Sequence, residues 1–76
     1  MICPIFMKDA KDVERVSKVA SEAGIDMSVS CGYDMIDPRS ILGLFTFMGK
    51  DALLVAPDDM SPNYFMRLVK KMGVAA

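Results

Sequence analysis

The segment Asp37–Met48 constrains the fold of this chain more than any other part of the sequence. A proline and a serine precede a short, largely apolar stretch that contains Gly43. Serine is a preferred cap for the free backbone N–H groups at a helix start, so the pattern predicts a short helix that begins at Ser40. Asp37 and Pro38 are alternative starts, and either would place Ser40 within the first turn. A helix with so many apolar residues is unusual in a domain whose core is so small.

Composition limits the class of protein. The 76 residues predict a single domain, residues 1–76, and the shares of 53% hydrophobic and 25% charged residues are typical of a soluble globular chain. The net charge is -1 and no basic stripe is present, which argues against a nucleic-acid partner. The longest apolar run, Ile41–Met48, is far shorter than the roughly 20 residues that span a bilayer, and we recognise no signal peptide. We therefore expect a cytoplasmic protein without membrane insertion.

Hydrophobic periodicity predicts an alternation of strands and helices. Strands are expected at residues 1–7, 25–31, 34–36 and 52–56, and helices at residues 9–23, after Ser40 and after Ser61. Pro4 has no N–H group for a strand ladder, which predicts that the first strand lies at a sheet edge. Residues 52–56 are all apolar, which indicates an interior strand with better cover than the edge. Gly32 and Tyr33 are expected to form a two-residue hairpin turn with a positive φ at the glycine.

Both long helices carry an apolar stripe at helical spacing. The first is expected to bury Val13, Val16, Ala20 and Ala23, and the last Phe65, Leu68, Val69 and Met72. The resulting order is β-α-β-β-α-β-α, with helices on one sheet face. Two α+β folds fit this order: an open-faced β-sandwich, and a ferredoxin-like split βαβ unit with an appended helix. The second fold usually needs a longer middle helix than the two turns expected here.

The segment from Ile25 to Met48 carries the most specific resemblance to a known family. Its strand, hairpin, Arg39-Ser40-Ile41 step, Gly43 and apolar helix resemble, without a gap, those of HPr, the histidine-containing phosphocarrier of the bacterial sugar phosphotransferase system. The resemblance extends over nearly the whole chain, with a short deletion before the last strand. It implies an HPr-like open-faced β-sandwich whose four-stranded antiparallel sheet has three helices on one face.

The residue that carries the chemistry of HPr is missing, because this chain contains no histidine. Aligned with the family, the phosphoryl-accepting histidine falls on Asp9, and the arginine two residues later falls on Lys11. Asp9 and Asp12 are typical of a helix start, where carboxylates cap N–H groups, and together they would repel a phosphate. The alternative is a phosphocarrier that uses the carboxylate of Asp9 in place of histidine. We expect no enzymatic activity, cofactor or metal site.

The resemblance also implies two functional features near Ser40. The matching serine of many Gram-positive HPr proteins is phosphorylated by a dedicated kinase, so Ser40 is a candidate regulatory phosphorylation site; the alternative is a serine that only caps the helix. Ile41, Leu42 and Phe45 match the positions at which HPr binds its protein partners. An apolar helix cannot turn every side inward, which is consistent with an exposed contact surface.

Helical spacing permits a different orientation of the same helix. In that alternative, Ile41, Leu44, Phe45 and Met48 point into the core, and Leu42 and Phe47 are scattered surface residues. Cys3 and Cys31 lie in strand-like segments without disulfide or metal-ligand spacing and are expected to be free thiols. The sequence thus predicts an HPr-like regulatory or partner-binding domain whose partners are phosphotransferase-system proteins, or a serine kinase or regulator.

Overall fold

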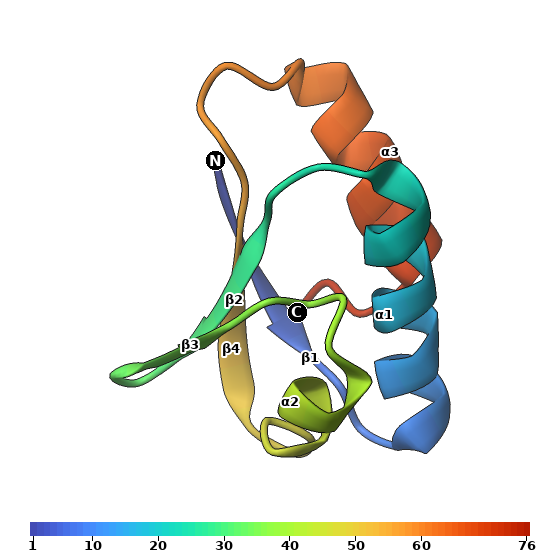
Figure 1. Cartoon of the computed structure of the whole chain (residues 1–76), viewed down its shortest axis with the longest axis vertical. Helices are drawn as coiled ribbons and strands as arrows, with labels where there is room; N and C mark the ends of the chain where they lie inside the picture. Colours follow the sequence, from blue (N-terminus) through green and yellow to red (C-terminus); the bar gives the residue numbers. More distant parts are fainter.

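The sheet and its helix layer follow the predicted order along the chain. The computed structural model describes all 76 residues. Its elements are β1 (Ile2–Phe6), α1 (Ala10–Ala23), β2 (Ser28–Cys31), β3 (Asp34–Ile36), α2 (Ile41–Phe45), β4 (Asp51–Val55) and α3 (Pro62–Met72). The strands form one antiparallel sheet in the order β1-β4-β2-β3. Figure 1 shows the helices on one side of this sheet, so the α+β architecture is confirmed.

Strand β4 lies in the sheet interior, between β1 and β2. Its residue Leu54 pairs with Cys3 of β1 on one side and with Val29 of β2 on the other. Directly paired residues project to the same face of a sheet, so these three side chains share the face under the helices. Leu54 and Val29 are fully buried there. The predicted edge position of β1 is also confirmed, since β4 is its only neighbour among the named strands.

The two long helices bury the predicted stripes. In α1 the buried apolar residues are Val13, Val16 and Ala20, while Ala23 is half-buried. In α3 all four expected residues are buried. Helix α1 packs against both α3 and α2, and thereby holds the helix layer together. None of the three helices combines the length and apolarity needed to cross a membrane.

Turn chemistry sets the boundaries of several elements. Asp9 caps α1, Ser61 caps α3, and both helices end at a glycine with positive φ, Gly24 and Gly73. Gly32, with a φ of 61°, begins the hairpin between β2 and β3 as predicted. Glycine is favoured there because a Cβ atom destabilises this backbone conformation.

One expectation about the strands needs correction, and another is confirmed. Strand β2 begins at Ser28, three residues later than expected, since only Ser28, Val29 and Ser30 pair with β4. Strand β4 is interior, but only one of its faces is covered: Leu54 is fully buried, whereas Leu53 is 39% exposed on the other face. The expectation of an interior strand with better cover than the edge strand is confirmed, and the apolar run extends over both the buried and the open face.

The adjacent residues Leu53 and Leu54 provide a matched test of this one-sided burial. We expect Leu54→Ala to lower the free energy of unfolding by about 2–5 kcal/mol, because it leaves a cavity beneath the helices. Leu53→Ala should cost less than about 1 kcal/mol, since its side chain is already partly solvated. Urea denaturation of both variants measures the difference. Equal losses would contradict the assignment of the two sheet faces.

Candidate functional site

Helix α2 begins where the sequence predicts but ends early. Ser40 is its N-cap, and the hydroxyl oxygen accepts a hydrogen bond from the Gly43 N–H at 3.4 Å. The helix ends at Phe45, and the next residues form tighter turns, in which Phe47 N–H donates to the Leu44 carbonyl at 3.0 Å. These bonds join residues three apart, as in a 3₁₀ turn, and rotate the following side chains relative to an α-helix.

This change of pitch decides which apolar residues enter the core. Leu44 is fully buried and Phe47 is 4% exposed. The remaining four apolar side chains are exposed, namely Ile41 (38%), Leu42 (79%), Phe45 (37%) and Met48 (39%). We call these four residues the α2 patch. The alternative orientation is right for Leu44 in the core and Leu42 at the surface. It is wrong for Ile41, Phe45 and Met48, which are exposed, and for Phe47, which the tighter turns after Phe45 direct inward.

A close contact with β3 fixes the position of α2. A Cβ atom added to Gly43 would lie 3.2 Å from Cδ1 of Ile36, which is tighter than normal packing. Glycine therefore lets the helix lie against the strand that follows the hairpin. The Ser17 hydroxyl of α1 donates to the Arg39 carbonyl at 3.2 Å and ties the start of α2 to the first helix. These two contacts hold α2, and with it the α2 patch, in a fixed position on the domain.

Arg39, the cation beside Ser40, is already paired with two aspartates. The guanidinium of Arg39 donates to both carboxylate oxygens of Asp37, at 2.7 to 3.1 Å, and to Asp26 at 3.3 Å. These side-chain hydrogen bonds, together with one from the Arg39 backbone N–H, lower the pKa of Asp37, and the same carboxylate raises the pKa of Arg39. The Ser40 side chain itself is exposed. Any phosphate on Ser40 would therefore compete with Asp37 for the arginine.

The position that matches the HPr histidine is a helix cap. Oδ1 of Asp9 accepts a hydrogen bond from the Asp12 N–H at 3.0 Å, and Oδ2 of Asp12 accepts from the Lys8 N–H at 3.0 Å. The two carboxylates thus satisfy backbone N–H groups at the start of α1. Lys11 is exposed and forms no ion pair. The capping interpretation of Asp9 and Asp12 is confirmed.

Sequence reasoning missed the role of Arg15. Its guanidinium pairs with Asp12 and donates to the Met72 carbonyl at 3.1 Å, which links the start of α1 to the end of α3. The hydrogen bond from the Lys8 N–H is the largest cause that lowers the pKa of Asp12, followed by the hydrogen bond from Arg15. The spacing of three residues between Asp12 and Arg15 was a visible signal for this pair.

The start of α1 and the end of the α2 segment lie at the same end of the molecule. Gly49 N–H donates to the Met7 carbonyl at 2.8 Å, which brings the chain after Met48 against the residues that precede Asp9. Figure 1 shows α2 at the end of the molecule where α1 begins. The structure thus gathers the α2 patch and the Asp9 cap in one region. It contains no group of three or more histidine, cysteine, aspartate or glutamate side chains that could hold a metal ion.

The fold and this surface define an open-faced α+β domain with an exposed apolar helix. No protein-family model matches the sequence, and no curated protein matches it either. The class of this protein is therefore inferred from its architecture and from the geometry of the α2 patch.

The lowered pKa of Asp12 predicts a specific dependence of stability on pH. A carboxylate with a lower pKa in the folded state stabilises the protein above its unfolded pKa, and this contribution is lost as the pH falls through the folded value. Asp12→Asn should therefore be less stable than the parent at neutral pH, and the difference should shrink below a pH of about 4.

Urea denaturation at a series of pH values measures this difference. Glu14→Gln, on the exposed face of the same helix, controls for the loss of one carboxylate. A constant gap between the parent and Asp12→Asn down to the lowest pH would contradict the proposed contribution of Asp12.

Proposed function

We propose that this protein is an HPr-like regulatory or partner-binding domain that uses the α2 patch and does not transfer phosphate. The observation that carries the proposal is the exposure of Ile41, Leu42 and Phe45, which correspond to partner-binding positions in the family it resembles. Clustered exposed apolar residues on a small domain are typical of protein contact sites. The partners that fit are proteins of the bacterial sugar phosphotransferase system.

The cap at the start of α1 supports binding without phosphate transfer. The Asp9 carboxylate that replaces the histidine already accepts a backbone N–H, and Asp12 lies beside it with its own negative charge. An incoming phosphate would meet both charges, which disfavours its approach. Lys11 is a point charge without the planar fork with which arginine binds phosphate. No observation favours the alternative in which Asp9 carries the phosphoryl group.

Ser40 fits a regulatory role through charge and accessibility. Its side chain is exposed at the start of α2, next to Ile41 of the α2 patch. Phosphorylation would add close to two negative charges at the border of an apolar contact, where desolvation of charge is costly. On this proposal, modification of Ser40 weakens or redirects partner binding. The attachment of Arg39 to Asp37 makes the arginine a weak phosphate ligand.

Substitutions in the α2 patch provide the test of this function. The partner to test is enzyme I, the phosphotransferase-system protein that HPr contacts at the positions matched by the α2 patch. Leu42→Glu places a charge at the most exposed patch residue and should weaken binding to purified enzyme I by roughly 1–3 kcal/mol. Ser40→Asp should act in the same direction, while it leaves the fold intact because aspartate is also a good N-cap. Isothermal titration calorimetry measures the affinities, and thermal unfolding checks the fold.

Leu53→Glu is the matched control, since it introduces the same charge at a partly exposed leucine on the uncovered sheet face. It should bind enzyme I as the parent does. If Leu42→Glu and Ser40→Asp also bind like the parent, the α2 patch is not the contact surface. If both variants unfold, helix α2 is part of the core and cannot serve as the contact surface.

A further inference from the structure

The uncovered sheet face is apolar along β1 and β4. Leu53 of β4 pairs with Pro4 of β1 and with Ser30 of β2, and paired residues project to the same face. In an antiparallel sheet with one solvated face, the outward positions are commonly polar. Serines follow this rule in β2, but the outward positions of β1 and β4 are all apolar except for Asp51. These two strands therefore have the composition of strands that are covered on both faces.

A shallow hollow of about 310 Å³ lies on this uncovered face. Its lining includes Pro4, Leu53, Ser30, Gly32 and Asp51. The Ser30 hydroxyl and the Asp51 carboxylate form no hydrogen bond or ion pair within the chain. The hollow thus combines apolar walls with two oxygen acceptors that are free.

Tyr33 is the most exposed aromatic residue of the chain, with a relative exposure of 109%. It lies in the turn between β2 and β3, and Figure 1 shows this hairpin projecting away from the helices. Because Tyr33 is fully solvated, its ring does not enter the hollow of its own chain. Tyrosine is enriched at protein contacts, where an apolar ring and a hydroxyl group are buried together.

The hairpin tip and the hollow are complementary in their chemistry. A tyrosine ring packs against apolar walls, which Pro4 and Leu53 supply, and its hydroxyl donates to an acceptor, which Asp51 supplies. A second copy brings a tip to the hollow of the first copy and receives the tip of the first copy in its own hollow. Such a reciprocal contact is the defining property of a twofold symmetric dimer.

Neither charge nor area opposes a contact between two copies. The net charge of the chain is -1, and Asp51 is the one charged residue among the paired outward positions of the sheet. Together, Ile2, Tyr33, Met35 and Leu53 expose roughly 500 Å². A symmetric contact that covers them buries about 1,000 Å² in total, which reaches the lower limit of a specific interface.

We propose that a second copy of this chain docks on the uncovered sheet face, with Tyr33 of each copy seated in the hollow of the other. The two sheets face each other as in a β-sandwich, and the small side chains of Ser28 and Ser30 let them approach. The Tyr33 hydroxyl donates to the Asp51 carboxylate of the other copy. Helix α2 lies on the opposite side of the sheet, so each copy keeps its α2 patch free.

Analytical ultracentrifugation from micromolar to millimolar protein measures this self-association. We expect a reversible monomer–dimer equilibrium with a dissociation constant on the order of 10–100 µM, because the contact area is small. Tyr33→Ala should weaken the dimer at least about tenfold, although its side chain contributes no burial to the single chain. Tyr33→Phe keeps the ring and removes the hydroxyl, and should weaken the dimer by about threefold to tenfold.

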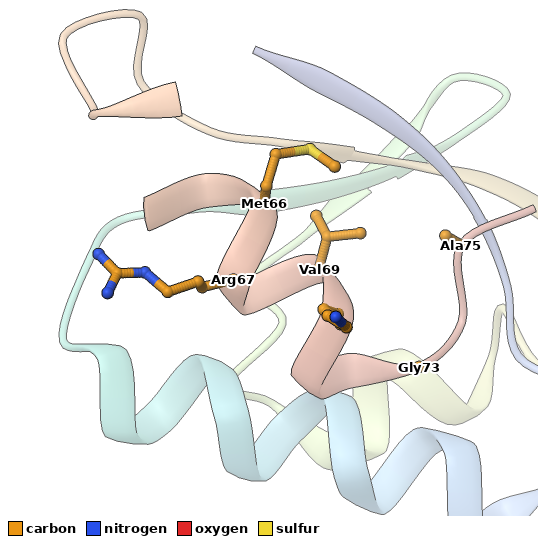
Figure 2. Close-up of a pocket in the computed structure, with 6 residues that line it drawn as sticks. Met66, Arg67, Val69, Gly73 and Ala75 are labelled. Carbon is orange, nitrogen blue, oxygen red and sulfur yellow. The ribbon is translucent and has the colours of Figure 1, made fainter. Parts of the chain in front are cut away.

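Met66→Ala is the matched control for the loss of an exposed side chain. Figure 2 shows Met66 on α3, in the helix layer, and its side chain is 61% exposed. This variant should dimerise as the parent does. Thermal unfolding confirms that each variant is folded.

A mixture of two variants tests the exchange of tips. Ser30→Leu fills the hollow and should also weaken the dimer at least about tenfold. A Tyr33→Ala copy keeps an empty hollow, and a Ser30→Leu copy keeps its tip, so the mixed pair forms one of the two contacts. The mixture should therefore associate more tightly than either variant alone. Amide NMR signals of labelled Tyr33→Ala should shift at Leu53 and Asp51 when unlabelled Ser30→Leu is added.

Three results would overturn the inference. The first is the absence of self-association at millimolar protein, and the second is a dimer that Tyr33→Ala and Ser30→Leu leave unchanged. The third is a mixture that associates no more tightly than the separate variants, which would exclude the reciprocal contact. A dimer that Leu42→Glu abolishes while Tyr33→Ala does not would assign self-association to the α2 patch instead.

Discussion

The architecture depends on the burial of one face of β4 beneath the helix layer. This strand pairs with β1 on one side and β2 on the other, and its residues Ala52 and Leu54 enter the core. A chain of this length buries a smaller share of its surface than a larger domain, so a single covered face must supply most of the apolar burial. The opposite face carries exposed residues such as Leu53 and Met35.

The exposed α2 patch follows from the same limit on the core. Leu44 and Phe47 insert into the core. The close approach of Gly43 to Ile36 sets the distance between α2 and β3. The early end of the helix at Phe45 turns Phe47 inward. The other apolar side chains of the segment then have no core to enter and remain on the surface. A short helix with two anchors thus presents an apolar surface.

Much of the fold was predictable from local patterns. The missing N–H of Pro4 predicted the edge position of β1. Capping residues predicted the starts of all three helices, and Gly32 predicted the position of the hairpin. The exposure of Leu53 was not predictable, because an apolar run does not say whether one or both faces of a strand are covered. That property depends on the number of helices and on their placement.

The candidate site was predictable only in part. The cap role of Asp9 followed from its residue type and from Asp12 three residues later. The inward turn of Phe47 did not follow, because it depends on a switch from α-helical to 3₁₀ hydrogen bonding that the sequence pattern conceals. The pairing of Arg39 with Asp37 and Asp26 likewise required the folded geometry.

The central claim is that this domain binds protein partners through α2. Its most direct test is an amide NMR titration of the labelled domain with enzyme I, the partner that we propose. The account predicts that the largest changes fall on Ile41–Met48 and on the adjacent start of α1 near Asp9. A titration that produced no changes, or changes confined to α3 and the uncovered sheet face, would contradict it.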